Sequence, residues 1–209
     1  MIYINDSFSG IEKEEYFAEY NMLSSQRKII VDRYRKFEDK VRSVCAYRLL
    51  QKGLLLEYGI KDSPIFEYSE YGKPSIIGFP DIHFNISHCQ NAIVCGISNA
   101  PIGVDIENIR DVKDEFVNYC FNETEISLVE HSISPGLQFA ILWTRKESYL
   151  KLHGKGINND MKNVLCEIDE NSVSFNTMIN EEKGYVCTIC RNSGLMRAKS
   201  IQKKKESII

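Results

Sequence analysis

The stretch from Trp143 to Gly156, WTRKESYLKLHGKG, constrains the fold more than any other part of this 209-residue chain. It has the spacing of about three helical turns that a Gly-Lys-Gly sequence brings to an end. At about 100° per residue, the apolar residues of the predicted helix fall on two sides. One side consists of Phe139, Leu142, Trp143, Tyr149 and Leu150, and the other of Leu137, Ile141 and Leu152. We therefore expect a helix over 136–152 that is covered on two flanks.

Charged residues interrupt the apolar sides of this helix. Lys146 falls inside the first apolar stripe, while Glu147 and Lys151, four residues apart, lie on one face along its edge. Cations and a carboxylate at the margin of a mostly buried helix predict a site that faces a crevice. The plainer interpretation is a surface Glu–Lys pair beside a lysine whose stem packs on apolar surface. It explains this stretch equally well when the stretch is considered alone.

The bulk composition argues against several classes of protein. With 43% hydrophobic and 26% charged residues, the chain is typical of a globular protein, and its net charge of −3 argues against a general nucleic-acid binder. No apolar run approaches the roughly 20 residues that a membrane helix needs. No apolar core precedes the first acidic residue, Asp6, so we expect no signal peptide, no membrane partner and a cytoplasmic protein.

The seven cysteines are an odd number and are scattered through apolar segments. This is typical of reduced thiols in a cytosolic protein rather than of a disulfide framework. Cys187 and Cys190 spell C-x-x-C, but they lie in an alternating, strand-like run without a second pair. The four histidines lack the spacing of zinc ligands. We therefore expect neither a disulfide core nor a zinc site.

Apolar periodicity and turn residues predict two successive groups of helices and strands. Helices are expected at 11–22, at 26–37 after a Ser24-Ser25 cap, at 38–58 before Gly59, at 113–120, at 123–132 after Asn122, and at 136–152. Strands are expected at 1–4, 65–68, 83–88, 92–98, 102–107, 163–168, 172–176 and 185–191, with a turn at 70–74. This order predicts an N-terminal half, 1–100, and a C-terminal half, 101–209, with a frayed tail from about 199.

The strand expected at 102–107 places two carboxylates on one face. Gly103, Asp105 and Glu107 alternate with three aliphatic residues, and the two carboxylates are about 7 Å apart along the strand. If this face is partly buried, the carboxylates repel one another unless a positive group lies beside them. Either Lys or Arg neighbours or a bound cation would supply that charge, and an acidic strand end in solvent is the plainer alternative.

Glu147 is a candidate third carboxylate for the same site. Oxygen ligands without a nearby His or Cys suit Mg²⁺, which keeps several waters and is often completed by substrate phosphate. Lys146 and Lys151 would pair with the phosphate oxygens that the metal does not take. Together these residues predict a site for Mg²⁺ and a diphosphate.

Four blocks of the sequence resemble, in the right order, the signature blocks of the 4′-phosphopantetheinyl transferases. They are Glu70-Tyr-Gly-Lys-Pro74, Phe84-Asn-Ile-Ser-His88, Gly103-Val-Asp-Ile-Glu107, and Trp143-x-x-Lys-Glu-Ser-Tyr-x-Lys151 followed by Gly154-Lys-Gly156. The chain length resembles that of the larger, surfactin-synthetase-activating type. The resemblance implies an α/β (α+β) fold, a single-chain pseudo-dimer of two similar α/β halves with the active site in the cleft between them.

The resemblance also implies an enzyme, a holo-[carrier protein] synthase. Its reaction would be Mg-dependent transfer of 4′-phosphopantetheine from coenzyme A to a serine of an apo acyl or peptidyl carrier protein, with release of adenosine 3′,5′-bisphosphate. Mg²⁺ would be the cofactor, coenzyme A the co-substrate, and the carrier protein the partner of a monomeric chain, docked on helices 113–132. Two alternatives stay open: a catalytically inactive coenzyme A-binding protein, and a Mg-dependent nucleotide phosphohydrolase.

By motif position, the resemblance assigns roles to individual residues. The metal ligands would be Asp105, Glu107 and Glu147, and the catalytic residues would be Glu147, Lys151, Asp105 and His88. Coenzyme A would contact Arg27, Ser43, Lys73, Pro74, Ser87, His88, Lys146 and Lys151. Lys146 and Lys151 would face the diphosphate, Ser87 and His88 the phosphates, and Lys73 with Pro74 the adenine side. Glu125 matches an acidic position that helps to order the site.

In the implied chemistry, a serine hydroxyl attacks the β-phosphorus, and Lys151 stabilises the leaving group. The hydroxyl proton would pass either to Glu147 or to a Mg-bound water that Glu147 orients. Two positions depart from the family pattern. Ile30 stands where relatives often carry a basic residue, and Cys89-Gln90 follows the Ser-His pair where Ser or Gly is usual. We therefore expect one phosphate contact fewer on the second helix and an altered loop after His88.

Overall fold

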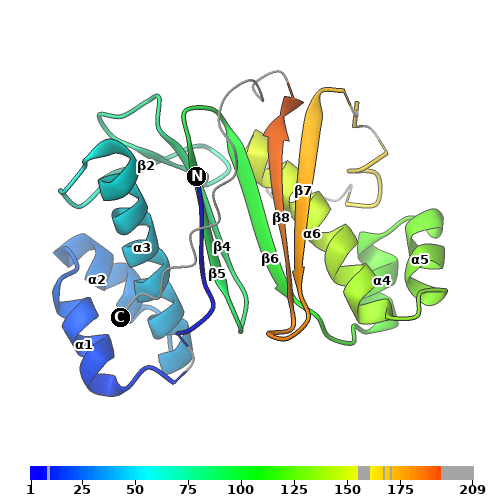
Figure 1. Ribbon diagram of the computed structural model, residues 1–209, viewed down its shortest axis with the longest axis horizontal. Helices are drawn as coiled ribbons and strands as arrows, with labels where there is room; N and C mark the ends of the chain where they lie inside the picture. The colour runs from blue at the N-terminus through cyan, green and yellow to red at the C-terminus, as the bar shows by residue number, and fades with distance from the viewer. Residues whose placement is uncertain (9, 155–160, 167, 170, 194–209) are drawn as a thin grey trace.

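The computed structural model describes residues 1–8, 10–154, 161–166, 168–169 and 171–193, and in them one succession of elements occurs twice (Figure 1). The N-terminal copy consists of β1 (Ile2–Asn5), α1 (Lys13–Asn21), α2 (Ser25–Asp32), α3 (Phe37–Tyr58), β4 (His83–His88) and β5 (Ile93–Ser98), with a hairpin of β2 (Phe66–Tyr68) and β3 (Pro74–Ile76) before β4. The C-terminal copy consists of β6 (Ile102–Asn108), α4 (Asp114–Cys120), α5 (Glu123–Glu130), α6 (Pro135–His153), β7 (Val173–Asn180) and β8 (Tyr185–Asn192).

Each copy contains an antiparallel three-stranded sheet, and the two sheets have the same strand order. The orders are β1–β5–β4 and β6–β8–β7, so in both sheets the first strand pairs with the last strand, which in turn pairs with the strand before it. The predicted mixed α/β class is therefore confirmed. The division predicted after residue 100 falls between β5 and β6.

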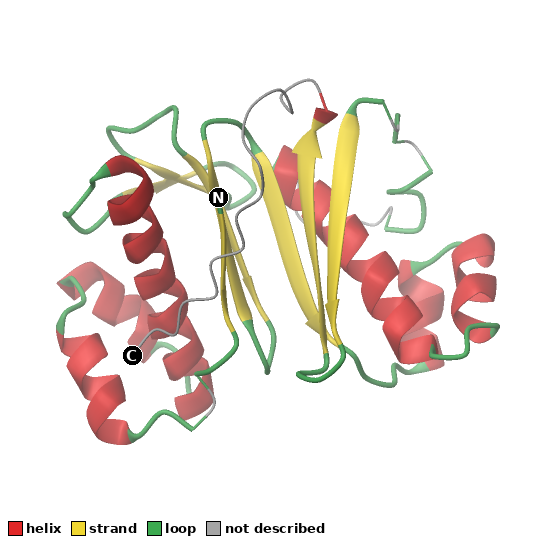
Figure 2. Cartoon of the chain, viewed as in Figure 1, coloured by secondary structure: helices red, strands yellow, loops and turns green. Residues whose placement is uncertain are grey.

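The two sheets lie at the centre of the molecule and the helices lie outside them (Figure 2). Helix α3 packs on β5 and β1, and α6 packs on β6 and β8. The inner faces of the sheets share an apolar core in which the aliphatic residues of β6 are fully buried. Its buried members are Cys89, Ala92, Val94, Ile102, Val104, Ile106, Tyr185, Cys187 and Ile189. Because β6 alternates, its other face carries Gly103, Asp105 and Glu107 toward α6.

Side chains cap the starts of α2 and α5, and glycines end α3 and α6. Ser24 accepts a hydrogen bond from the backbone N–H of Arg27 at the start of α2. Asn122 and Glu125 form a complete capping box on α5. Helices α3 and α6 both end at a left-handed glycine, Gly59 and Gly154. The caps predicted at Ser24, Asn122, Gly59 and Gly154 are therefore confirmed.

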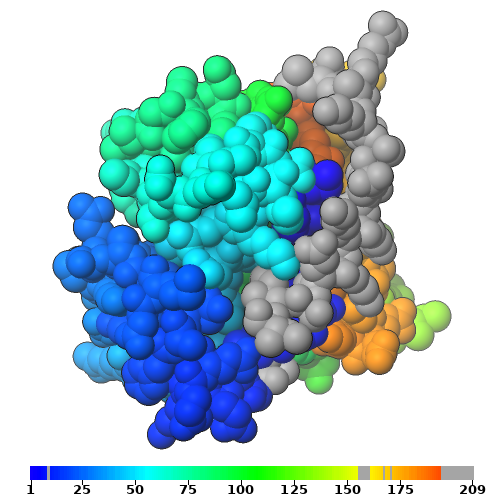
Figure 3. All heavy atoms as spheres, turned by 60° about the vertical axis from the view of Figure 1, so that its left-hand side comes forward, coloured from blue at the N-terminus to red at the C-terminus, as the bar shows by residue number. Residues whose placement is uncertain are grey.

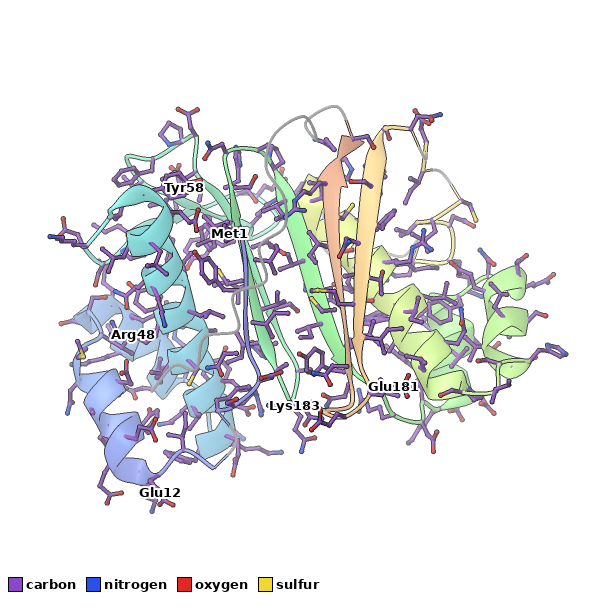
Figure 4. All side chains as sticks on the ribbon, in the orientation of Figure 1. Met1, Glu12, Arg48, Tyr58, Glu181 and Lys183 are labelled. Atoms are coloured by element: carbon purple, nitrogen blue, oxygen red, sulfur yellow. The ribbon has the colours of Figure 1, made fainter. Side chains whose placement is uncertain are left out.

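Polar contacts at the turn between β7 and β8 also join the two halves. The ammonium of Lys183 donates to Asp6 O at 2.6 Å and to Asp6 Oδ1 at 3.0 Å, and the Tyr185 hydroxyl donates to Asp6 Oδ2 at 3.0 Å. The Asn91 amide donates to Lys183 O at 2.8 Å. Figure 4 labels Lys183 at this turn, beside the lower ends of β4 and β5. The first residues of the chain and the last hairpin are thus held together.

Several details differ from the sequence-based expectations. The strand expected at 163–168 is wrong, because residues 163–166 form turns, whereas residue 167 lies outside the described residues. Helix α2 ends at Asp32 rather than at 37, because Phe37 begins α3 and packs its ring against Tyr16. The tail from 199 and the glycine at 156 also lie outside the described residues.

One face of the molecule is formed by the N-terminal helices and the small hairpin. In Figure 3, α1 and α2 (blue) lie beneath the segment around β2 and β3 (cyan to teal). The strand β3 was not expected from the sequence, because it begins at the proline of the Gly-Lys-Pro turn and its three residues are too few to show alternation. Among the described residues, no helix combines the length and the apolar character that crossing a membrane requires.

Candidate functional site

The candidate site lies where β6 crosses α6, and this contact depends on a glycine. A Cβ atom on Gly103 would lie 1.9 Å from the carbonyl oxygen of Ser148 and 2.5 Å from the backbone nitrogen of Leu152. Both neighbours are backbone atoms of a helix, so they cannot move aside individually. The absence of a side chain at Gly103 therefore lets α6 approach the strand closely, with Asp105 and Glu107 next along the same face.

The three predicted carboxylates lie in one mostly buried region and interact with one another electrostatically. Asp105 is 3% exposed and Glu147 is 8% exposed. Burial, followed by repulsion from Asp105, raises the pKa of Glu147 to about 7. Burial and Asp105 also raise the pKa of Glu107, although Arg110, Lys151 and a hydrogen bond with Trp143 oppose this rise. The carboxylates thus destabilise one another's charged forms, as expected for a site that lacks sufficient positive charge.

Lys151 provides positive charge at this cluster. Its ammonium lies 2.5 Å from Asp105 Oδ1, 3.0 Å from Ser87 Oγ and 4.0 Å from Glu147 Oε2. Ser87 itself donates to Asp105 Oδ1 at 2.7 Å. Residues of three separate sequence blocks therefore meet within hydrogen-bonding distance, because β4, β6 and α6 converge here.

Asn85 is a residue of this region that the sequence did not single out. Its side-chain oxygen accepts a hydrogen bond from the backbone N–H of Val104 at 2.8 Å, although Asn85 belongs to β4 and Val104 to β6. Asn85 and Ser87 are two residues apart on one strand, so they point to the same side. That alternation was the signal from which Asn85 could have been found. The pair ties the N-terminal sheet to the strand that carries Asp105.

The donor set suits a hard divalent cation such as Mg²⁺. Asp105 Oδ2 and Glu147 Oε1 are buried oxygens without a hydrogen-bond partner, and all three candidate ligands offer oxygen. Within the described ranges, however, no three acidic, His or Cys side chains already converge as a ligand set. The ammonium of Lys151, rather than a metal ion, is paired with Asp105 Oδ1. Binding a metal here therefore requires side-chain rotation, with Lys151 yielding part of its contact with Asp105.

Lys146 does not join this cluster. It is completely buried, as its place in the apolar stripe suggests, and its ammonium donates to Glu125 Oε2 at 2.7 Å, Cys120 O at 2.9 Å and Met161 O at 2.6 Å. With its three donors engaged inside the core of α4, α5 and α6, it does not reach toward Asp105. This placement differs from the predicted diphosphate contact. Lys146 instead ties α6 to the capping box of α5 through Glu125.

Lys73 and Pro74 lie at the turn between β2 and β3. Pro74 begins β3 and pairs with Tyr68. The ammonium of Lys73 donates to the carbonyl oxygens of Lys151 at 2.6 Å and Leu152 at 2.8 Å. The side chain of Lys73 thus reaches the end of α6, and the adenine-side contact expected for these two residues stays a prediction.

Arg27 and Ser43 contact each other on the N-terminal half. One guanidinium nitrogen of Arg27 donates to Ser43 Oγ at 2.9 Å and to Ser43 O at 3.0 Å. The guanidinium also lies 5.0 Å from the centre of the Tyr47 ring. Its Nε is buried without a hydrogen-bond partner. Both predicted coenzyme A contacts therefore lie together, one on α2 and one on α3.

His88 ends β4, next to Ser87, and keeps contact with solvent. Partial burial lowers the pKa of its imidazole, and the positive charges of Arg42 and Lys151 lower it further. Arg42, which pairs with Asp39 on α3, is thus a second cation near this strand end. The sequence did not single out Arg42, although it directly precedes Ser43.

Comparisons with known proteins agree on one class of enzyme. Residues 101–200 match the 4′-phosphopantetheinyl transferase superfamily. The chain is 32% identical over 160 residues to the 4′-phosphopantetheinyl transferase Sfp of Bacillus subtilis strain 168, a match that covers 75% of this chain and 70% of that protein. It is 39% identical over 145 residues to the 4′-phosphopantetheinyl transferase gsp of Aneurinibacillus migulanus, covering 66% of this chain and 60% of the relative.

A third relative, the 4′-phosphopantetheinyl transferase HetI of a Nostoc species, is 33% identical over 132 residues, which are 58% of this chain and 55% of that protein. The family match over residues 101–200 contains β6 and α6, the two elements that carry the carboxylates and Lys151. The chain belongs to the 4′-phosphopantetheinyl transferase superfamily and is a transferase.

Proposed function

We propose that this enzyme transfers 4′-phosphopantetheine from coenzyme A to a serine of an apo acyl or peptidyl carrier protein and releases adenosine 3′,5′-bisphosphate. One observation supports this proposal most strongly. Lys151 and the buried carboxylates Asp105 and Glu147 meet at one strand–helix contact, with two carboxylate oxygens free of hydrogen bonds. Such a set of hard oxygens beside an ammonium suits a magnesium diphosphate.

We propose that Asp105, Glu107 and Glu147 hold Mg²⁺. When bound, Mg²⁺ would supply charge neutralisation at the diphosphate and relieve the repulsion among the three carboxylates. Lys151 would then turn from Asp105 toward a phosphate oxygen, where its charge stabilises the leaving group. Ser87 and His88 would hold the phosphates at the end of β4, and Arg27 and Ser43 would contact coenzyme A from the N-terminal half.

We propose that Glu147 governs the proton of the attacking serine hydroxyl. Its pKa of about 7 suits proton acceptance near neutral pH. A carboxylate that ligates a cation is a weaker base, so a water oriented by Glu147 is the alternative acceptor. In both cases the loss of the Glu147 carboxylate removes the acceptor or its orientation.

The two halves of the fold give this proposal its geometry. Their repeated topology supports a pseudo-dimer within one chain, with coenzyme A bound between the halves and the carrier protein docked on α4 and α5. The chain would act as a monomer in the cytoplasm. Free cysteines throughout the described residues agree with a reducing compartment.

The direct test incubates the protein with coenzyme A, Mg²⁺ and several apo carrier proteins, and then weighs each carrier by mass spectrometry. We expect one added phosphopantetheine on at least one carrier, together with an equal amount of adenosine bisphosphate. No added mass on any carrier would refute the proposal. Coenzyme A binding without turnover would indicate the inactive binding protein instead, and adenosine bisphosphate release without a carrier would indicate the phosphohydrolase.

A matched pair of variants tests the role of Glu147. Glu147→Gln should lower the transfer rate by about 10²–10³-fold, because the isosteric amide can neither ligate the metal strongly nor take the proton. Glu181→Gln makes the same chemical change on an exposed glutamate at the turn between β7 and β8 (Figure 4), and should leave the rate unchanged. Equal rates in both variants would contradict the assignment.

A further inference from the structure

The end of α6 is held by a residue from the other half of the molecule. The last four carbonyl groups of a helix lack partners within the helix. At the end of α6, the backbone N–H of Gly154 donates to the carbonyls of Leu150 and Lys151. The ammonium of Lys73 donates to the carbonyls of Lys151 at 2.6 Å and Leu152 at 2.8 Å. A positive charge is also favourable at this negative end of the helix dipole.

The backbone of Lys73 is itself fixed. Its N–H donates to Ser69 Oγ at 3.1 Å, and its carbonyl accepts from the N–H of Ser69 at 3.0 Å. Gly72 adopts a left-handed conformation in the same turn, with φ of 81°, and donates to Ser69 O. Burial lowers the pKa of the Lys73 ammonium, in agreement with its enclosed position. Lys73 is therefore a well-anchored cap rather than a freely moving surface lysine.

Gly154, the glycine that ends α6, lies against the side chain of Lys73. A Cβ on Gly154 would lie 3.2 Å from Cδ of Lys73, which is tighter than an ordinary contact. Gly59, which ends α3 with nearly the same φ, would meet nothing within 4 Å. The two helix ends have the same conformation, but only at Gly154 does a side chain lie across the glycine. A side chain at Gly154 would therefore press on the Lys73 side chain, which donates to the carbonyls of the last turn.

Lys73 binds the backbone of Lys151, the residue whose ammonium contacts the Asp105 carboxylate. It holds the carbonyl of Lys151, while the ammonium of Lys151 reaches Asp105 and Ser87. Rotation or fraying of the last turn of α6 would move that ammonium, since its side chain starts from the held backbone. We propose that Lys73 is a positioning residue, which caps α6 from the N-terminal half and thereby keeps Lys151 aimed at the phosphate site.

This inference rests on the proposed function for its kinetic consequences, but the capping contact can be tested without it. In Lys73→Met, the aliphatic chain stays and the ammonium is lost. We expect kcat for carrier modification to fall by about 10–100-fold, because small misplacements of reacting groups have effects of this size. The Kd of coenzyme A should change by less than about threefold, and Lys73→Arg should restore most of kcat, since it keeps donors and charge.

Hydrogen exchange of residues 150–154 provides the readout that needs no activity. Exchange there should speed up by about tenfold or more in Lys73→Met and stay near the wild-type rate in Lys73→Arg. Gly154→Ala should lower kcat as Lys73→Met does. Gly59→Ala, which introduces the same left-handed strain without a neighbour, should leave kcat unchanged.

The outcomes separate the two proposals. If the wild-type protein modifies no carrier, the proposed function fails, and the exchange rates still decide whether Lys73 caps α6. The inference is overturned if Lys73→Met weakens coenzyme A binding with kcat intact, which would make Lys73 a ligand contact only. It is also overturned if exchange at 150–154 is unchanged, or if Gly154→Ala and Gly59→Ala have equal effects on kcat.

Discussion

The first strand of each half meets the long helix of that half, but the two contacts are made in opposite ways. In the N-terminal half the glycine lies on the helix, where Gly53 of α3 leaves room for the Tyr3 ring of β1. In the C-terminal half the glycine lies on the strand, where Gly103 of β6 leaves room for the backbone of α6. The first contact is filled by apolar side chains, and the second places Asp105 beside Glu147.

This difference shows how one topology supports both a packing unit and a chemical site. Helix α3 buries apolar residues against its sheet, among them Val44, Leu50 and Leu54. Helix α6 buries Lys146 and Glu147 as well, and each charge therefore needs a partner. Lys146 forms an ion pair with Glu125 of the same half. Glu147 shares Lys151 with Asp105, and a bound metal ion would supply the positive charge that this cluster lacks.

The largest expected effect is a loss of stability when Gly103 is replaced by a residue with a side chain. Gly103→Ala should lower the free energy of unfolding by about 4 kcal/mol or more, because its Cβ would overlap backbone atoms of α6. Gly53→Ala should cost about 1–3 kcal/mol, because its Cβ meets the ends of the Ile97 and Tyr3 side chains, which can shift. Urea unfolding measures both, and similar losses in the two variants would contradict the comparison.

The next effect concerns the buried ion pair of the C-terminal half. Lys146→Met should lower the free energy of unfolding by about 3 kcal/mol, since it leaves Glu125 buried without its cation. Adding Glu125→Gln should recover part of this loss. As a control, Lys183→Met removes the partly exposed pair with Asp6 and should cost only about 1 kcal/mol. If chemical denaturation shows a larger loss in the free energy of unfolding for Lys183→Met than for Lys146→Met, this account is contradicted.

A smaller effect should appear in the pH dependence of stability. The folded pKa of Glu147, about 7, lies above the usual value of 4.5, so between these values the folded protein holds a proton that the unfolded chain releases. The stabilisation is therefore fully present below about pH 4.5 and is lost as pH rises through about 7. Without divalent cations, the free energy of unfolding of the wild type should fall by about 2 kcal/mol relative to that of Glu147→Gln between pH 5 and pH 8.

Measuring stability with added Mg²⁺ provides a second test of this prediction. Mg²⁺ should raise the stability of the wild type at pH 8 and reduce the advantage of Glu147→Gln, because the ion neutralises the carboxylate that the variant lacks. Parallel pH profiles for the two proteins in the absence of Mg²⁺ would show that Glu147 does not carry the raised pKa.

Much of the fold could be predicted from local patterns. The alternation at 102–107, the caps at Ser24 and Asn122, and the glycine after α3 each act within a few residues, and the structure confirms them. The segment 163–168 was assigned wrongly because short alternation also occurs in turns. Helix α2 ended early because its end is set by packing of Phe37 on Tyr16, which no local pattern shows.

The candidate site was predicted in composition but not in all its contacts. The apolar stripe placed Lys146 in the interior, but its partners Glu125, Cys120 and Met161 come from separate segments, so the sequence could not show that its donors are taken. For the same reason no local pattern shows that Lys73 reaches the end of α6. The Lys73 side chain lies against the first glycine of the Gly-Lys-Gly sequence, which ends α6 in the left-handed conformation.

The most direct test of the central claim compares the first strands of the two halves in one assay. Asp105→Ala on β6 and Asn5→Ala on β1 each remove a buried polar side chain. Carrier modification with coenzyme A and Mg²⁺ is then measured by mass spectrometry, with circular dichroism confirming that both variants fold. We predict that Asp105→Ala loses about 10²–10³-fold in rate, while Asn5→Ala retains the wild-type rate within about threefold. Near-normal turnover in folded Asp105→Ala would contradict the claim that β6 carries the chemistry.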